Sequence, residues 1–146
     1  MSPTNLRLDD QLCFALYAAT NQVTRAYRPL LESIGLTYPQ YLVMLVLWEA
    51  DSRPIGDIAD RLQLSPHALS PLLRRLEAAG FVARRVDAVD GRVVNVELTD
   101  LGRELESAAS RAQYDVVDQT GLCDEDLGDL RAALHALVLG MSKESS

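Results

Sequence analysis

The chain has 146 residues, of which 48% are hydrophobic, and its formal net charge at pH 7 is −7. This length and apolar content predict one globular domain, residues 1–146, with a packed core. The longest apolar run, 41–48, is far shorter than the roughly 18 residues that a membrane span needs. Residues 1–4 have neither the basic nor the apolar region of a secretion signal. A cytoplasmic protein with no membrane partner is therefore expected.

The cysteines and histidines argue against two kinds of site. Cys13 and Cys123 stand 110 positions apart, and His67 and His135 are equally scattered. This spacing predicts neither a disulfide framework nor a zinc site. No metal and no cofactor are expected.

Two helices are predicted in the N-terminal region, residues 8–53. Asp9 and Asp10 precede apolar residues at helical spacing, which predicts a long amphipathic helix that Pro29 kinks or breaks and Gly35 ends. The capping box 37–40 then predicts the start of a second helix. The body of this second helix is apolar on every side, so we expect it at the centre of the protein.

Residues 54–99 predict a helix-turn-helix followed by a β-hairpin. Apolar spacing predicts a short helix over 55–62. Ser65 as N-cap and Pro66 at the first helical position predict a second helix, which Gly80 ends. Runs rich in β-branched residues predict two strands, with Asp90-Gly91 as the turn signal between them. The strands are expected at 81–86 and 93–98. This combination is a winged helix, whose second helix enters the major groove of DNA.

The C-terminal region, 100–141, is predicted to be helical. Thr99-Asp100 is expected to cap one helix, with Leu101 facing inward, and Gly121 to end it. Asp124 is expected to cap the last helix, and the tail from Ser142 onward is expected to fray. The first, fifth and sixth helices have more apolar surface than one small domain covers. We expect them to form a homodimer, which places two recognition helices about one DNA turn apart. The alternative is that these helices pack only within one chain.

The net charge of −7 argues at first against nucleic-acid binding. The charge is unevenly distributed, however. Residues 52–99 contain seven arginines and six acidic residues, a net charge of +1, so the rest of the chain has −8. Because phosphate contacts need a local basic face rather than a basic protein, DNA binding stays open.

Four segments resemble one family of bacterial regulators. Asp90-Gly91-Arg92 in the predicted hairpin loop and Leu98-Thr99 before the next helix resemble the MarR family. The runs Leu12-Cys13-Phe14-Ala15-Leu16-Tyr17 and Leu36-Thr37-Tyr38-Pro39-Gln40-Tyr41-Leu42 resemble the organic hydroperoxide resistance regulators (OhrR), a redox-sensing branch of that family. The resemblance extends from Leu8 to about Leu139.

For the redox site, the resemblance implies that Cys13 is a peroxide-reactive cysteine. Tyr17, Tyr27 and Tyr38 match the tyrosines that surround this cysteine and hydrogen-bond to it, some from the partner subunit. Reduced protein would occupy the operator of a peroxide-detoxifying gene, and oxidation by an organic hydroperoxide would release it. The second cysteine, Cys123, is either a resolving thiol that captures oxidised Cys13 or a small residue of a loop.

The residues themselves fit this chemistry only in part. Cys13 stands near a helix start, where the dipole favours the thiolate that attacks peroxides, although Asp9 and Asp10 oppose it. Tyr17 lies one helical turn from Cys13, and Phe14 adds an apolar rim. Without the resemblance, an inert buried cysteine beside core tyrosines would explain the pattern better.

For DNA, the resemblance implies that Arg92 enters the minor groove and that Asp90 holds it. Candidate contacts on the recognition helix are His67, Ser70, Arg74 and Arg75. His67 and Ser70 are able to donate to bases or phosphates, although His67 is equally well explained as merely solvated. The arginines fit phosphate contacts, unless one pairs with Glu77 or Glu49. The start 66–70 departs from the serine- and threonine-rich start usual in the branch, which leaves the operator sequence open.

Three functions remain in competition. The leading one is a redox-controlled repressor that is not an enzyme. The second keeps the winged dimer but has a small aromatic or phenolic ligand, bound between domains, do the switching. The third is a thiol peroxidase that uses Cys13, against which the sequence offers no sheet scaffold and no CxxC motif.

Overall fold

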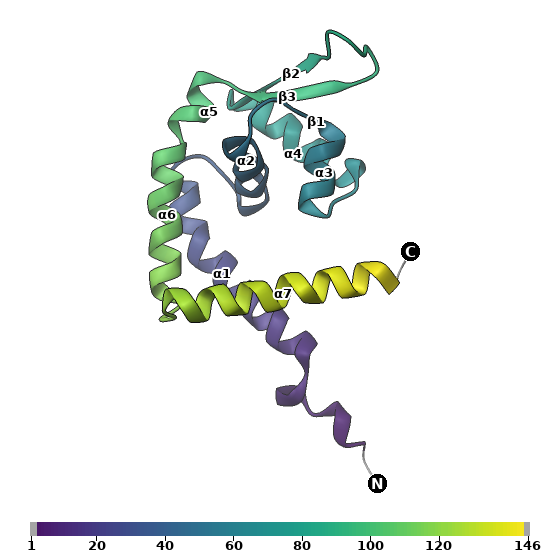
Figure 1. Cartoon of the computed structure of the whole chain (residues 1–146). Coiled ribbons are helices and arrows are strands. Elements are labelled where there is room, and N and C mark those ends of the chain that lie inside the picture. Colours follow the sequence, from purple (N-terminus) through teal and green to yellow (C-terminus); the bar gives the residue numbers. More distant parts are fainter. Residues whose placement is uncertain (1–2, 145–146) are drawn as a thin grey trace. The chain divides into compact units, whose positions relative to one another are not determined.

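The computed structural model describes residues 3–144, which form two compact units that divide between Gln113 and Tyr114 (Figure 1). The protein is mainly α-helical with a small antiparallel sheet, as predicted. The first unit contains η1 (Thr4–Leu6), η2 (Leu8–Asp10), α1 (Leu12–Glu32), α2 (Tyr38–Glu49), β1 (Arg53–Pro54), α3 (Ile55–Leu62), α4 (Pro66–Ala78), β2 (Val82–Val86), β3 (Val94–Leu98) and α5 (Asp100–Glu104). Helix α6 (Glu106–Gln119) crosses the division, and α7 (Asp124–Glu144) belongs to the second unit.

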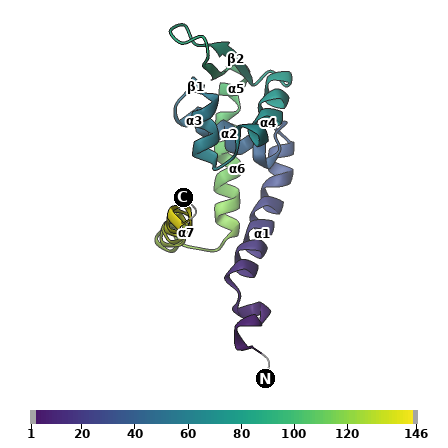
Figure 2. The same ribbon diagram turned by 90° about the vertical axis from the view of Figure 1, so that its right-hand side faces the viewer.

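Helix α1 is continuous through Pro29, so the predicted break is wrong. The helix ends at Glu32, one turn later. Because Pro29 has no amide hydrogen to donate, it removes only one hydrogen bond, close to the end of the helix. Asp9 and Asp10 lie in the separate turn η2 rather than in the first turn of α1. Among the residues of α1, which are all described, only Tyr27 and Leu31 are buried. The N-terminal half of α1 extends away from α2, α3 and α4 (Figure 2).

Helix α2 is the central helix of the first unit, as predicted. Its capping box is complete: the amide of Gln40 donates to Thr37 Oγ1 at 3.3 Å, and the amide of Thr37 donates to Gln40 Oε1 at 3.0 Å. Val43, Met44 and Leu47 have no exposed surface. This burial anchors α2 and fixes the positions of the helices packed against it.

The helix-turn-helix consists of α3 and α4, as predicted. The side chain of Ser65 caps α4 by accepting from the amide of Ala68 at 3.1 Å. On the inner face of α4, Leu69, Leu73 and Leu76 are fully buried. Gly80 ends the helix with a φ of +85°, a conformation that costs glycine little.

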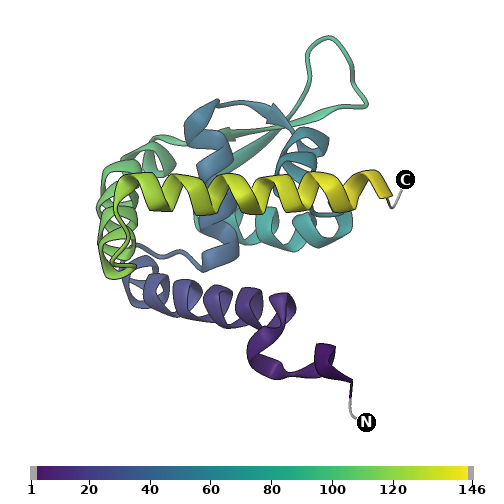
Figure 3. The ribbon, with the colours of Figure 1, turned by 60° about the horizontal axis from the view of Figure 1, so that its bottom comes forward.

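The sheet has three strands, in the order β1-β3-β2, where a two-stranded hairpin was predicted. The missed strand, β1, is two residues long and contains Pro54, so its sequence has no alternating pattern. Its position depends on pairing with β3, where Arg53 lies opposite Val96. The side chain of Asp51 assists by accepting from the amide of Leu98 at 2.8 Å. The loop between β2 and β3 extends beyond the helices (Figure 3).

The helix predicted after Thr99 is divided at Leu105 into α5 and α6. Gly102 explains the position of α5, because a Cβ on this residue would stand 2.1 Å from the carbonyl oxygen of Phe81. The indole of Trp48 also donates to the Gly102 carbonyl oxygen at 3.0 Å. Held in this way, α5 leaves Leu101 46% exposed, so the prediction that Leu101 faces inward is wrong.

The last helix begins differently from the prediction. Cys123, not Asp124, caps α7: its carbonyl accepts from the amide of Leu127 at 2.9 Å and its Sγ accepts from the amide of Asp126 at 3.5 Å. Ser142 is still helical, so fraying does not begin there; the predicted frayed residues 145–146 lie outside the described residues. No side chain of α7 between Asp124 and Ser142 is buried.

Candidate DNA interface and candidate redox site

The outer face of α4 has the composition of a DNA-reading surface. His67, Pro71 and Arg74 lie opposite the buried leucines at helical spacing, and all three are exposed. Ser70 is half-buried at one edge of this face, and Arg75 is exposed at the other. Pro71 was not anticipated by the sequence analysis. Its lack of an amide leaves the carbonyl of His67 without its intrahelical donor.

Neither Arg74 nor Arg75 pairs with Glu77 or Glu49, the two acidic residues that the sequence analysis considered as partners. Glu77 binds Arg84, with 3.2 Å between Oε1 and Nη2, and Glu49 binds Arg61 at 2.8 Å. The hydrogen bond to Arg84 holds the pKa of Glu77 below its usual value. Within residues 3–144 no ion pair involves Arg74 or Arg75. Both guanidinium groups are therefore available to phosphates.

Two aspartates shape the tip of the hairpin loop. Asp87 accepts hydrogen bonds from the amides of Val89 and Asp90 and from the side chain of Asn95, at 2.9–3.1 Å, and these bonds lower its pKa. The carboxylate of Asp90 accepts hydrogen bonds from Nε and Nη2 of Arg92, at 3.1 and 3.3 Å. These hydrogen bonds lower the pKa of Asp90. The side chain of Arg92 is still 92% exposed. The loop thus presents an oriented guanidinium to solvent.

Cys13 is the second residue of α1, and its side chain is exposed. Tyr17, one turn later, is 68% exposed, and Phe14 is 37% exposed. The apolar rim expected around the thiol is therefore not closed within one chain. This part of α1 extends away from α2, α3 and α4, which leaves the thiol and its neighbours exposed in the single chain.

Tyr27 and Tyr38 lie together, but far from Cys13 of the same chain. Their ring centroids are 5.6 Å apart. Fourteen residues of continuous helix separate Cys13 from Tyr27, which corresponds to roughly 21 Å along the axis. Within one chain, the tyrosines thus have no access to the thiol.

A third tyrosine, Tyr41, completes the cluster, and the sequence analysis did not single it out. Its ring centroid lies 5.1 Å from that of Tyr27 and 6.3 Å from that of Tyr38. Burial raises the pKa of all three hydroxyls above the ordinary value, so they stay protonated at neutral pH. The available signal was the spacing of Tyr38 and Tyr41, which puts both on one face of α2.

The chain is similar to known proteins over most or all of its length. The sequence profile of the MarR family matches residues 36–94. The organic hydroperoxide resistance transcriptional regulator of Bacillus subtilis is 35% identical over 92% of this chain and 91% of its own length. The chain belongs to the MarR family. The regulator TtmR of Methylorubrum extorquens is 47% identical over 88% of this MarR-family chain and 70% of its own length.

Solved structures agree with the family assignment. Reduced AbfR bound to DNA matches with a TM-score of 0.81 and 30% identity over all of both chains. AbfR, from Staphylococcus epidermidis, has also been solved in a disulfide-formed state, which matches with a TM-score of 0.66 and 31% identity over 95% and 92% of the two chains. This protein is thus a MarR-family transcriptional regulator, and its homologues are named as regulators rather than enzymes.

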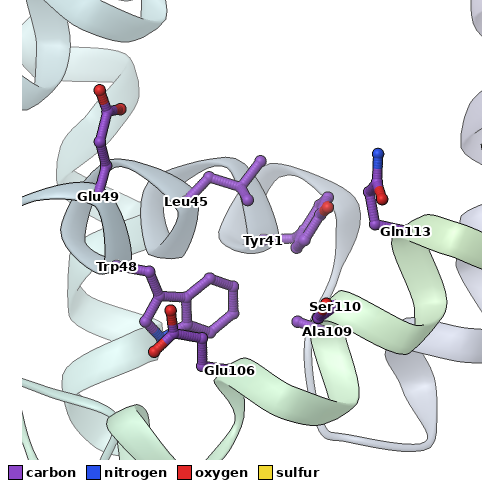
Figure 4. Close-up of a pocket in the computed structure, with 8 residues that line it drawn as sticks. All are labelled: Tyr41, Leu45, Trp48, Glu49, Glu106, Ala109, Ser110 and Gln113. Carbon is purple, nitrogen blue, oxygen red and sulfur yellow. The ribbon is translucent and has the colours of Figure 1, made fainter. Parts of the chain in front are cut away.

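The MarR-family chain also has a pocket of about 310 Å³ between α2 and the first half of α6 (Figure 4). Tyr41, Leu45 and Trp48 form its apolar side. The polar side is formed by Glu49, Glu106, Ser110 and Gln113, and Ala109 completes the lining. Because Glu49 is already paired with Arg61 at 2.8 Å, Glu106 is the carboxylate of this lining that favours a positive charge on a ligand with an apolar body.

Two negative findings concern the residues described here. No helix between residues 3 and 144 combines the length and the apolar character that crossing a bilayer requires. In the same range, no three histidine, cysteine, aspartate or glutamate side chains gather as metal ligands.

Proposed function

We propose that this protein is a cytoplasmic, redox-sensing repressor that binds operator DNA when reduced and leaves it when an organic hydroperoxide oxidises Cys13. The observation that supports it is the division of the site: an exposed thiol at one end of α1, and protonated tyrosine hydroxyls near the other. Within one chain, the Cys13 thiol has no access to Tyr27 and Tyr38, and these two tyrosines have no thiol nearby. Two copies that exchange these halves would form two complete sites.

The dimer would use the helical regions 8–53 and 100–141. Large apolar side chains of the first and last helices are exposed in the single chain, among them Leu12, Leu130, Leu139 and Met141. Exposed apolar stripes on long helices are typical of surfaces that a second chain covers. In a C₂ dimer, Cys13 of one copy would approach Tyr27 and Tyr38 of the other, beside Tyr17.

The chemistry requires a thiolate. The sulfur of Cys13 attacks one oxygen of ROOH, forming an S–O bond while the O–O bond breaks; the leaving alkoxide takes a proton and departs as the alcohol. Cys13 becomes a sulfenic acid. Hydroxyls of Tyr27 and Tyr38 favour the thiolate because a hydrogen bond to a charged group stabilises it by about 1.5–3 kcal/mol.

On DNA, α4 would occupy the major groove while Arg92 enters the minor groove. His67 and Ser70 would contact bases or phosphates, Arg74 and Arg75 phosphates, and Asp90 would keep Arg92 oriented. A gel shift on the protein's own upstream DNA, with and without cumene hydroperoxide, tests the proposal. We expect a complex that peroxide dissolves and a thiol reductant restores. A complex indifferent to peroxide would contradict it.

Cys123 is proposed as the resolving thiol. Its sulfur lies at the N-cap of α7, is exposed, and is the second of the two cysteines. Its thiolate would attack the sulfenic sulfur of Cys13 of the other copy, forming an S–S bond as the S–O bond breaks, and the leaving hydroxide would take a proton and depart as water. A disulfide requires Cα atoms within roughly 7 Å. Closing it would draw helices across the interface and change the spacing of the recognition helices.

Peroxide is therefore expected to produce a reductant-sensitive dimer on denaturing gels. The dimer should be absent in both Cys13→Ser and Cys123→Ser. A peroxide-treated wild type that stays monomeric, with Cys13 left as sulfenic acid or joined to a small thiol, would make Cys123 a bystander. Mass spectrometry of the tryptic peptides distinguishes these products.

A small-ligand switch is the second candidate, favoured by the pocket between α2 and α6. Its aromatic side fits an aromatic or phenolic body, and the carboxylate of Glu106 disfavours an aromatic acid. Thermal-shift assays with an aromatic amine, a neutral phenol and benzoate distinguish these classes. Stabilisation by the amine together with release from DNA would support this candidate; no shift with any of the three would remove it.

A further inference from the structure

We propose that Asp87 is a positioning residue for DNA binding: its carboxylate fastens the tip of the hairpin loop to β3 and thereby fixes the backbone from which Arg92 points. The inference rests on the proposed function, in which Arg92 enters the minor groove. Neither the sequence pattern nor the resemblance assigned a role to Asp87.

The carboxylate of Asp87 connects the loop tip to the sheet. Its Oδ2 accepts hydrogen bonds from the amides of Val89 and Asp90, at 3.1 and 2.9 Å. Its Oδ1 accepts from Nδ2 of Asn95 at 2.9 Å. Asn95 belongs to the central strand β3, and at this position β3 is paired with both β1 and β2. The tip is therefore fastened to a part of the sheet that is held from both sides.

The hydrogen bonds continue from Asp87 to Arg92. The amide of Arg92 donates to Oδ1 of Asp90 at 3.0 Å, and Nε of Arg92 donates to the same oxygen at 3.1 Å. At the base of the loop, the amide of Asp87 donates to the carbonyl oxygen of Val93 at 2.8 Å, and the amide of Val93 donates to that of Asp90 at 3.0 Å. Asp90, which orients Arg92, is thus itself held by Asp87 through its backbone amide.

The charge of Asp87 opposes DNA binding. Residues 87–93 contain two aspartates and one arginine, a net charge of −1. Phosphates repel a carboxylate on a loop that approaches them, so on charge alone removing Asp87 would raise the affinity for DNA. The hydrogen bonds act in the other direction, because a loop that is already ordered loses less conformational freedom on binding. The two effects predict opposite signs for the same substitution.

Two substitutions separate these effects. Asp87→Ala removes the charge and the hydrogen bonds, whereas Asp87→Asn removes the charge and keeps an acceptor. The oxygen of the new amide would accept from the amides of Val89 and Asp90, and its Nδ2 would donate to Asn95 once the Asn95 amide group turns over. By fluorescence anisotropy of the reduced protein on its own upstream DNA, we expect Asp87→Ala to bind about two- to tenfold more weakly, the effect of ordering one long side chain. Asp87→Asn should bind at least as tightly as the wild type.

A third substitution changes no charge. Asn95→Ala removes the bond between the carboxylate of Asp87 and β3 but leaves the bonds to the loop amides. We expect it to weaken DNA binding in the same direction as Asp87→Ala and by a smaller factor. Wild-type affinity for Asn95→Ala would contradict the connection to the sheet.

A double-mutant cycle decides whether Asp87 acts through Arg92. In an Arg92→Ala background, adding Asp87→Ala should cause no further loss of affinity. Tighter binding by Asp87→Ala alone, equal weakening by Asp87→Ala and Asp87→Asn, or additive losses with Arg92→Ala would each overturn the inference. Failure of the proposed function has a different signature: Arg92→Ala by itself would leave the affinity unchanged, and the inference would fall with the minor-groove contact.

Discussion

Cys13→Ser is expected to bind operator DNA with wild-type affinity and to stay bound at peroxide concentrations that release the wild type completely. The side chain is exposed near the start of α1, outside the packed part of the first unit, so the substitution removes reactivity and little packing. A serine hydroxyl does not form the thiolate that attacks the O–O bond. A peroxide titration of the DNA complex, followed by fluorescence anisotropy, measures the effect.

Two sets of variants control this result. Cys123→Ser should still form the sulfenic acid on Cys13, because the first oxidation occurs there, but it should stay on DNA longer than the wild type because it lacks the disulfide that draws helices across the interface. Tyr27→Phe and Tyr38→Phe should each slow thiol loss by roughly 10- to 150-fold, since each hydroxyl stabilises the thiolate by about 1.5–3 kcal/mol and every 1.4 kcal/mol is about a factor of ten. Release of Cys13→Ser by peroxide would refute the sensor role, and the small-ligand switch would become the leading function.

The sequence predicted those elements of the fold that depend on neighbouring residues. The capping box of α2, the Ser65-Pro66 start of α4 and the β-branched runs of the hairpin are local signals, and each appears in the structure. β1 was missed because a two-residue strand has no period and depends on pairing with β3. The division at Leu105 was missed because it follows from the close approach of Gly102 to Phe81, a contact distant in sequence.

The sequence predicted only those parts of the candidate site that follow from helical spacing or from the family resemblance. Helical spacing related Cys13 to Tyr17, but no spacing relates Tyr27 on α1 to Tyr38 and Tyr41 on α2; packing of the two helices does. The Ser65 cap is a common residue type at that position, whereas the cap of α7 by Cys123 is unusual, since Asp124 is the stronger capping residue by type. The exposed and buried halves of the proposed redox site are recognised only from the three-dimensional structure.

Arg92→Ala is expected to weaken operator binding by about 1–3 kcal/mol, the range of a specific arginine contact to DNA. The guanidinium is 92% exposed and is held by two hydrogen bonds to Asp90, so it is oriented before DNA arrives. Pre-orientation lowers the entropy cost of placing it in a narrow minor groove, where the negative potential attracts arginine. The fold should not change, because the side chain contacts only the loop.

Three further measurements separate a groove contact from a general loss of charge. Arg111→Ala removes one exposed positive charge from α6, outside the winged module, and should leave affinity nearly unchanged. Arg92→Lys keeps the charge but lacks the planar fork, so it should recover only part of the affinity. The slope of log K against log salt should fall by about one for Arg92→Ala if the contact is to phosphate. Unaltered affinity in Arg92→Ala, with an unchanged circular dichroism spectrum, would show that the wing tip does not touch the operator, leaving α4 as the DNA-reading surface.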